Sequence, residues 1–136
     1  LFRSGAKIGK NVVIRPSVKI TYPWKLTLGD YAWVGDDAVL YTLGEITIGA
    51  NSVVSQKCYL CTGSHDFMSQ HFDITASPIV IGEKCWLATD VFVAPGVSVG
   101  DGTVVGARSS VFKSLPANKI CRGNPAVVIR ERVETD

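Results

Sequence analysis

The stretch Ile81–Leu115 reads IGEKCWLATDVFVAPGVSVGDGTVVGARSSVFKSL, and an aliphatic residue returns in it at every sixth position. Glycine or alanine follows the first five of these aliphatic residues, and only the last is followed by a large side chain, Phe112. A six-residue period matches neither an amphipathic helix nor an ordinary strand meander. It predicts a β-helix, in which each hexapeptide forms one short strand and one corner, and three hexapeptides close a coil. The aliphatic positions are Ile81, Leu87, Val93, Val99, Val105 and Val111.

The same pattern extends towards the N-terminus, where further coils begin at Ile8, Leu28 and Ile48. The steps between these three residues are slightly longer than three hexapeptides. We expect the surplus in the first coil to form a bulged corner around Pro23, since proline is awkward inside a paired strand. The chain of 136 residues is therefore predicted to be one all-β domain, residues 1–136, with about five coils.

The regular pattern is interrupted once in the middle of the chain. Asp66 stands where the next aliphatic residue is due, and the pattern resumes only at Ile81. We therefore expect coils over about residues 8–65 and 81–115, with an inserted loop over about residues 66–80. Insertions in solenoids cluster on one face, which is often the binding face, so this loop is the first place to look for chemistry.

The repeat ends at Leu115–Pro116, and residues 116–136 are predicted to cap the open end of the stack. Within this cap, Pro125 follows a Gly–Asn turn and is suited to the first turn of a helix. We therefore expect a short C-terminal helix from Ala126 to Val133.

Composition excludes several classes of function. Lysine and arginine number 14 and aspartate and glutamate 12, so the chain lacks the strong positive charge typical of a nucleic-acid-binding protein. No apolar run approaches the ~20 residues of a membrane-spanning helix, and no signal segment precedes the repeats. We expect a cytoplasmic protein. Because the sequence starts at Leu1 and not at methionine, we also expect that a preceding segment is missing.

The four cysteines include Cys58 and Cys61, which have the spacing of a redox motif. In the repeat register, however, Cys58 and Cys85 occupy inward positions, whereas Cys61 falls at a corner. The pattern therefore favours small buried side chains in a reducing compartment. A second hypothesis is that Cys61, close to a histidine in sequence, accepts an acyl group during catalysis.

Several motifs of the chain resemble those of the left-handed β-helix hexapeptide acyltransferases, and the resemblance covers nearly all of it. Within that superfamily the colanic acid biosynthesis acetyltransferases are the most similar group, and the maltose, galactoside and nodulation-factor acetyltransferases are more distant. The motifs that carry the resemblance are Tyr22–Trp24, Trp33–Asp36, Cys61–Asp66 and Gly123–Ala126.

The resemblance implies a left-handed coil, a homotrimer, and acetyl-CoA as the co-substrate in the cleft between neighbouring subunits. It also implies an O-acetyltransferase that moves an acetyl group to a sugar hydroxyl in exopolysaccharide or cell-surface polysaccharide biosynthesis. A trimer would cover flat faces that carry Trp33, Tyr41 and Trp86. The identity of the saccharide acceptor is left open.

Acetyl transfer to a hydroxyl needs a base that removes the hydroxyl proton, and histidine suits that role near neutral pH. The family motif places its catalytic histidine at His65, while His71 is expected to be a loop residue that contacts acceptor or solvent. Asp66, Asp36 or Asp37 could orient the ring of His65. We expect direct attack in a ternary complex, in which positioning and stabilisation of the oxyanion supply most of the rate.

The resemblance also implies a set of donor-binding residues. Trp86 is expected to pack on the pantetheine arm, and the small Ala107 to let that arm lie against the coil. Thr89 or the amide of Ala88 is expected to stabilise the oxyanion. Basic side chains would neutralise the CoA phosphates. These are Lys113, Arg122 and Arg130.

Two other classes of function use a solenoid of this kind. A γ-type carbonic anhydrase needs three histidine ligands for zinc, and this chain has two histidines, so we expect no metal. A non-catalytic scaffold would not need to interrupt its register at the histidine of the family motif. Metal content separates the first alternative from an acetyltransferase, and thioester turnover separates the second.

Overall fold

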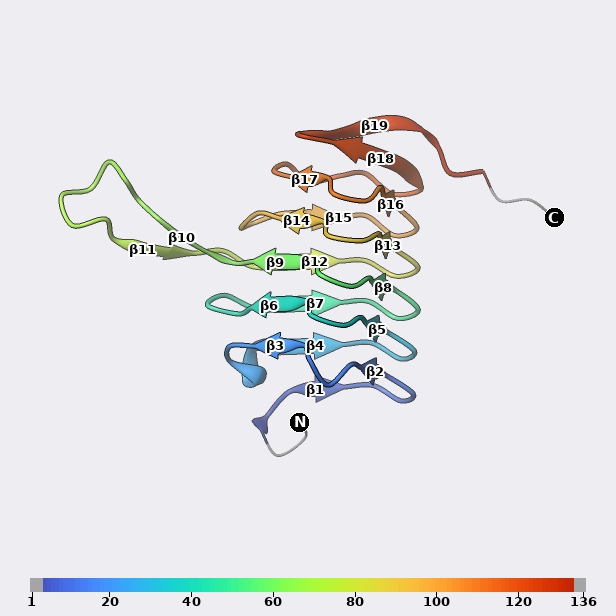
Figure 1. Ribbon diagram of the computed structural model, residues 1–136, viewed down its shortest axis with the longest axis horizontal. Coiled ribbons are helices and arrows are strands. Elements are labelled where there is room, and N and C mark those ends of the chain that lie inside the picture. Colours follow the sequence, from blue (N-terminus) through green and yellow to red (C-terminus); the bar gives the residue numbers. More distant parts are fainter. Residues whose placement is uncertain (1–3, 134–136) are drawn as a thin grey trace.

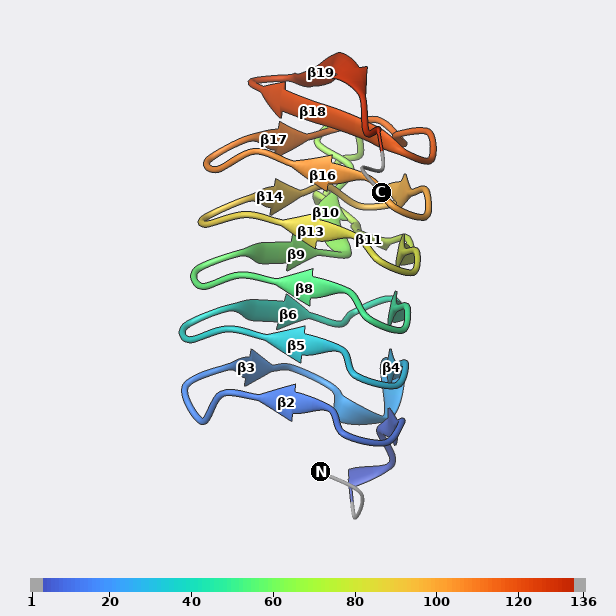
Figure 2. The ribbon, with the colours of Figure 1, turned by 90° about the vertical axis from the view of Figure 1, so that its right-hand side faces the viewer.

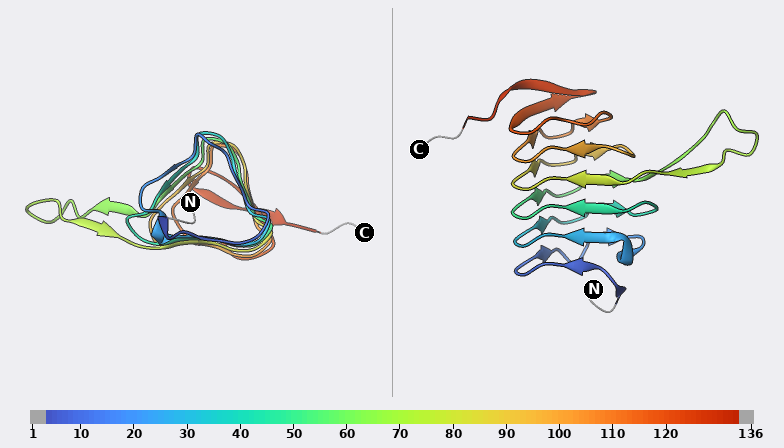
Figure 3. Two further views of the ribbon diagram at one scale, coloured as in Figure 1. Left: turned by 90° about the horizontal axis from the view of Figure 1, so that it is seen from below. Right: turned by 180° about the vertical axis from the view of Figure 1, so that it is seen from behind.

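The computed structural model describes residues 4–133 and shows a triangular prism of stacked coils (Figures 1 and 3). Five complete coils of three strands each are followed by a sixth, incomplete one, so the prediction of about five coils is confirmed. Followed from the N-terminus, the chain winds with a left-handed sense, as Figures 1 to 3 together show. The three sides of the prism are parallel sheets, here called sheets A, B and C in the order in which the chain enters them.

Each strand pairs with the strands one coil below and one coil above it. The bounds of the strands follow. Sheet A contains β1 (Lys7–Ile8), β4 (Leu26–Leu28), β7 (Ile46–Ile48), β12 (Ile79–Ile81) and β15 (Ser98–Val99). Sheet B contains β2 (Val13–Ile14), β5 (Trp33–Val34), β8 (Val53–Val54), β13 (Trp86–Leu87), β16 (Val104–Val105), β18 (Lys119–Gly123) and β19 (Ala126–Glu131). Sheet C contains β3 (Lys19–Ile20), β6 (Val39–Tyr41), β9 (Tyr59–Cys61), β14 (Phe92–Val93) and β17 (Ser110–Val111).

The period-six aliphatic residues point into the axis of the prism. Ile81, Leu87, Val93, Val99 and Val105 are all at most 2% exposed. Because neighbouring strands lie ~4.8 Å apart, inward side chains of one sheet stack in a continuous column. Their burial supplies the main driving force for folding, since the strands from β1 to β17 have only two or three residues each and make few contacts within their own coil.

Inward polar residues are satisfied by the main chain of adjacent coils. Ser52 donates to the carbonyl of Gly82 at 2.6 Å and accepts from the amide of Cys85 at 3.0 Å. Thr103 donates to Pro116 and accepts from Lys119. These side chains are therefore part of the ladder and are not available for chemistry.

The corner between sheets C and A, called the C–A corner below, carries the irregular segments. In the first coil a short 3-10 turn, η2 (Pro23–Lys25), takes up the surplus residues that the sequence predicted around Pro23. In the third coil an antiparallel hairpin of β10 (Gly63–His65) and β11 (Ile74–Ala76) projects from the prism. Figure 1 shows η2 and the hairpin at the same edge of the molecule.

The bounds expected for the insertion need correction. Gly63–His65 pairs with Ile74–Ala76, so His65 belongs to the hairpin and not to the end of a coil. The coil resumes at Ile79, which pairs with Ile46, and so two residues before Ile81. The period-six pattern did not predict these two ends of the insertion, because strand pairing defines them and not the position of an inward aliphatic residue.

The predicted C-terminal helix is wrong. Residues Ala126–Glu131 form β19, which folds back antiparallel on β18 (Figure 2). The β-branched run Val127–Ile129 favours a strand, and the upper edge of sheet B offers unpaired main-chain groups to it. These three side chains are about half exposed and do not cover the core, while Ala126 packs against it. The last residues of the expected cap, 134–136, lie outside the described residues.

The described part of the chain contains no helix long and apolar enough to span a membrane.

Candidate active site

The side chain of His65 lies on the outward hairpin, and its ring is held by the main chain. Nδ1 is 2.9 Å from the carbonyl oxygen of Phe72, which lies two residues before Ile74, the strand partner of His65. A carbonyl oxygen can only accept a hydrogen bond, so Nδ1 carries the proton in the neutral ring. Nε2 therefore keeps its lone pair, as a general base requires.

A small pocket of ≈ 90 Å³ lies beside His65 on the side of the hairpin that faces the N-terminal coils. Tyr41 and Leu43 reach it from the coil below, and their side chains press against Gly63, where a Cβ would come within 2.5 Å of Leu43. The wall of the pocket is completed by Ser64 and Ile74 from the two hairpin strands. The pocket is thus a mixed polar and apolar recess with an imidazole at its rim.

The carboxylates that the sequence analysis considered do not contact His65 in one chain. Asp66 accepts from the amide of Met68 at 3.0 Å, and its own amide donates to Asp73, so it closes the hairpin turn. Asp36 lies at another corner, between sheets B and C, where it pairs with Arg15 at 3.1 Å. Within one chain, the group that orients the ring of His65 is the main-chain carbonyl of Phe72. Every residue has such a carbonyl, so the sequence gives no sign of it.

Most of the expected donor-binding residues gather on sheet B and at the corner between sheets B and C, called the B–C corner below. Trp86 is 50% exposed on sheet B, and its indole nitrogen donates to the hydroxyl of Ser55 at 2.9 Å. Thr89 lies at the B–C corner, where its carbonyl accepts from the amide of Arg108 at 2.8 Å. Ala107, which precedes Arg108, is exposed in the next coil of the same corner.

The remaining basic candidates lie in the last coils. Arg122 on β18 and Arg130 on β19 extend sheet B and are exposed, and Lys113 is exposed at the C–A corner of the fifth coil. One expected oxyanion donor needs correction. The amide of Ala88 already donates to the carbonyl of Val105 at 2.9 Å, so it is committed to the parallel ladder. Thr89 is the donor of this pair that the ladder leaves available.

His65 and the residues on sheet B do not meet in a single chain. The hairpin leaves the prism at the C–A corner, as Figure 3 shows. The strand bounds place Trp86 on sheet B, and Thr89 and Ala107 at the B–C corner. Strands of sheet B carry an outward apolar column that includes Val13, Trp33 and Trp86, paired in register through the intervening strands. A site that combines the imidazole with Trp86 therefore requires two chains.

The cysteines are free, and three of them are buried. Burial raises the pKa of the Cys58 thiol to about 11, and it also raises the pKa values of Cys85 and Cys121. A thiol with a raised pKa is a poor nucleophile, because the thiolate is the reactive form. Cys61 is partly exposed, and its sulfur lies 3.1 Å from the carbonyl of Gly63. The described residues hold no cluster of three or more side chains with metal-ligating spacing.

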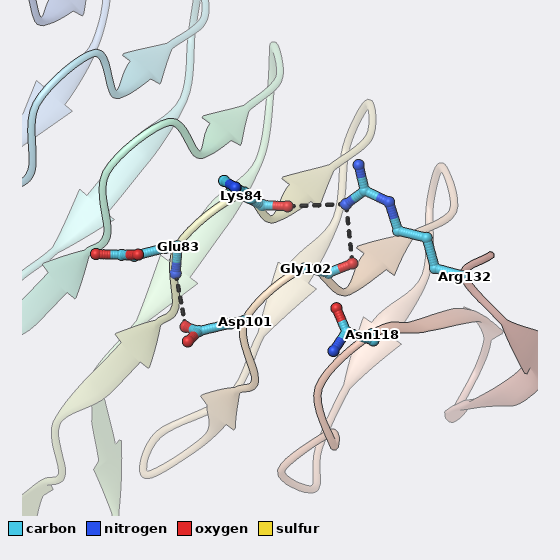
Figure 4. Close-up of a pocket in the computed structure, with 6 residues that line it drawn as sticks. All are labelled: Glu83, Lys84, Asp101, Gly102, Asn118 and Arg132. Atoms are coloured by element: carbon cyan, nitrogen blue, oxygen red, sulfur yellow. Dashed lines mark hydrogen bonds between the residues drawn. The ribbon is translucent and has the colours of Figure 1, made fainter. Parts of the chain in front are cut away.

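A larger, polar pocket of ≈ 230 Å³ lies at the corner between sheets A and B (Figure 4). Arg132 donates to the carbonyls of Lys84 and Gly102, both at 2.9 Å, and Asp101 accepts from the amide of Glu83 at 2.8 Å. These groups tie the C-terminal segment to two coils. The residues that line this pocket include no histidine or cysteine, so we assign the pocket a structural role and not a catalytic one.

Comparisons with known proteins match both the repeat and the fold of this chain. Residues 78–113 match the family described as bacterial transferase hexapeptide (six repeats). The chain is 89% identical over 132 residues to "Putative colanic acid biosynthesis acetyltransferase WcaF" of Escherichia coli (strain K12), covering 97% of this chain and 72% of that protein.

Solved structures of similar proteins include enzymes of the same fold. A maltose O-acetyltransferase from Clostridium difficile 630 is 28% identical, with a TM-score of 0.89 over 96% of this chain and 71% of that one. A galactoside acetyltransferase in complex with coenzyme A is also 28% identical, with a TM-score of 0.89 over 93% of this chain and 65% of that one.

Proposed function

The chain belongs to the hexapeptide-repeat acetyltransferases, enzymes that use acetyl-CoA, and from this we propose that it acetylates a sugar hydroxyl in the biosynthesis of an exopolysaccharide of the colanic acid type. The observation that carries the proposal is the ring of His65, whose Nδ1 is engaged by Phe72 while Nε2 is left with a lone pair beside a pocket. Because acetyl-CoA is made and used in the cytoplasm, we place the reaction there.

In the proposed mechanism, Nε2 of His65 accepts the proton of the acceptor hydroxyl as its oxygen attacks the thioester carbon of acetyl-CoA. The C–O bond forms as the carbonyl becomes an oxyanion, and Thr89 of a neighbouring chain supplies the hydrogen bond that stabilises it. Collapse breaks the C–S bond, and the proton held by His65 passes to the CoA thiolate. The carbonyl of Phe72 stabilises the imidazolium that exists between these two proton transfers.

The donor is proposed to lie in the cleft between neighbouring chains of a homotrimer. Trp86 offers a half-exposed apolar face to the pantetheine arm, and the exposed Ala107 leaves room for it. Lys113, Arg122 and Arg130 supply positive charge for the phosphates at the C-terminal end of the stack. Asp36 and Asp66 are retained only as groups that a second chain could bring towards the site, because neither contacts His65 within one chain.

The test is acetyl-CoA turnover, followed by the release of free thiol, for the wild type and for His65→Ala. We expect acceptor-dependent release to fall by about 10³-fold or more in the variant, since it removes the base, while the trimer and CoA binding persist. His71→Ala is the matched control, because His71 is exposed on the same hairpin. Its turnover should stay within about twofold of the wild type. Unchanged turnover in His65→Ala would refute the assignment of the base.

A further inference from the structure

An exposed aromatic pair lies at the C–A corner two coils below the hairpin. Trp24 is 58% exposed and Tyr22 is 36% exposed, and their ring centroids are 5.1 Å apart with an interplanar angle of 39°. Both residues are held in place, because the hydroxyl of Thr42 accepts from the amide of Tyr22 at 2.7 Å and lies 3.1 Å from its carbonyl oxygen, and Trp24 lies within the 3-10 turn η2. Adjacent exposed apolar side chains of this kind are typical of binding surfaces, whereas single exposed ones are not.

The pair is connected to the His65 pocket by a short series of contacts. The ammonium group of Lys25 donates to the carbonyl of Leu43 at 2.5 Å, and Leu43 lines the pocket. The same ammonium group lies 5.6 Å from the centroid of the Tyr22 ring. Two coil steps of ~4.8 Å separate η2 from the hairpin, so the aromatic pair lies about 10 Å along the prism from His65. That span is comparable with the reach of two linked pyranose rings.

The proposed donor-binding residues leave only the side of the pocket towards Tyr22 and Trp24 open to a long acceptor. Lys113, Arg122 and Arg130, the candidates for binding the phosphates of the donor, all lie in the last coils, on the C-terminal side of the hairpin. The His65 pocket is lined by the hairpin and by Tyr41 and Leu43 from the coil below it, so it lies on the N-terminal side of the hairpin. An acceptor that reaches Nε2 of His65 without crossing the donor must therefore leave the site towards Tyr22 and Trp24.

From this arrangement we propose that the acceptor is an oligosaccharide or a saccharide chain, one sugar of which occupies the His65 pocket while a further sugar stacks on Trp24 and Tyr22. This rests on the proposed function and names its substrate class. Pyranose rings present faces of C–H groups that pack on aromatic rings, and Lys25 offers a cation to hydroxyl or carboxylate groups of the chain. A free monosaccharide would fill the pocket but leave the aromatic pair uncovered.

The experiment compares acceptors of increasing length. Colanic acid that has been de-O-acetylated with mild alkali is partially hydrolysed and size-fractionated, and kcat/KM is measured from monosaccharide to hexasaccharide. For the wild type we expect kcat/KM to rise by about tenfold once the acceptor spans both sites. In Trp24→Ala the ratio of oligosaccharide to monosaccharide kcat/KM should fall by a similar factor. Tyr31→Asn is the matched control, since Tyr31 is 53% exposed but lies at the corner between sheets A and B, and it should preserve the ratio.

A binding measurement separates this proposal from the proposed function. The indole N–H resonance of Trp24, assigned by its loss in Trp24→Phe, is followed by NMR in the inactive His65→Ala variant as the hexasaccharide is added. A saturable shift supports the subsite even if no acetyl transfer is found with any acceptor. Transfer that is equally efficient for all lengths, with no shift at Trp24, would overturn the subsite and leave the transferase intact. A change of oligomeric state in Trp24→Ala, with an unchanged length ratio, would also overturn it, because the pair would then be a subunit contact.

Discussion

At the scale of single residues, the corners where neighbouring coils touch have no room for a side chain larger than that of glycine at some positions. A Cβ added at Gly49 would lie 2.6 Å from the carbonyl carbon and oxygen of Gly82 and 2.7 Å from the amide of Glu83. These are main-chain atoms of the next coil, so they cannot rotate away as a side chain would. The close approach of coils therefore requires glycine at Gly49, and a Cβ at Gly29 or Gly100 would also come within 2.5 Å of main-chain atoms.

We predict that Gly49→Ala destabilises the protein by about 3 kcal/mol, because the coils must separate locally and break ladder hydrogen bonds. Gly106→Ala is the control, since its new Cβ would meet the Cβ of Arg122 at 3.1 Å and no main-chain atom closer than 3.6 Å. Urea denaturation of both variants should show the smaller loss for Gly106→Ala. Equal losses would contradict the role assigned to contacts between coils.

The buried thiols make the stability of the protein depend on pH in the alkaline range. Desolvation raises the pKa of Cys58 from 9.0 to about 11, which means that the folded state holds this proton more tightly than the unfolded state. Its contribution to stability is therefore complete below pH 9 and is lost as the pH rises towards 11. The shift corresponds to an order of magnitude of about 3 kcal/mol.

We predict that the free energy of unfolding falls between pH 9 and pH 11, and that the fall is smaller in Cys58→Ala. Cys85, whose pKa is also raised by burial, contributes in the same direction, so part of the dependence should persist in the variant. Urea titrations at pH 8, 9, 10 and 11 measure the effect. A pH dependence that is identical in wild type and Cys58→Ala would contradict it.

At the scale of elements, the sequence predicted the coils because one physical requirement repeats. An inward aliphatic residue must return whenever the chain passes the axis, and Val93 and Val99 satisfy this without reference to distant residues. The hairpin and β19 carry no such signal. Their pairing depends on which edges are free in space, as with the edge of β18 that accepts β19. The interrupted pattern predicted an inserted loop over about residues 66–80, but the antiparallel pairing of its ends and the hydrogen bond from His65 to a main-chain carbonyl could not be predicted from residue types.

The end of the hairpin, residues 66–73, is predicted to be dispensable for folding and necessary for activity. His65 and Ile74 are directly paired, so residues 66–73 can be replaced by Asn–Gly, the preferred two-residue turn between antiparallel strands. This change removes the Phe72 carbonyl while it retains His65. Because the removed residues are almost all exposed, the thermal midpoint should change by only a few degrees, whereas acetyl transfer should fall by about 10²-fold or more. Retained activity would show that the carbonyl does not orient the ring, and a lost coil would show that the hairpin is structural.

At the scale of the whole molecule, the two halves of the proposed site lie on different edges of one prism. His65 projects from the C–A corner, and Ala107 lies at the B–C corner, so a single chain does not form a complete site. A cyclic trimer brings unlike edges of neighbouring chains together at each of its interfaces, because the contact in such a ring is heterologous. In the proposed trimer, the exposed column on sheet B, which includes Trp33 and Trp86, would supply apolar area for that contact.

This arrangement predicts complementation between two inactive variants. Ala107→Glu places a carboxylate where the pantetheine arm is proposed to lie, and His65→Ala removes the base, so each trimer alone should be inactive. In randomly mixed trimers from equal amounts of the two, a site is intact when one chain carries His65 and the correct neighbour carries Ala107. That occurs in about one quarter of the sites, so activity should return to about a quarter of the wild type after unfolding and refolding the mixture. Ala117→Glu, at the exposed corner between sheets A and B, is the control and should remain active without mixing. A mixture that stays inactive, although sedimentation shows mixed trimers, would mean that each site is built within one chain.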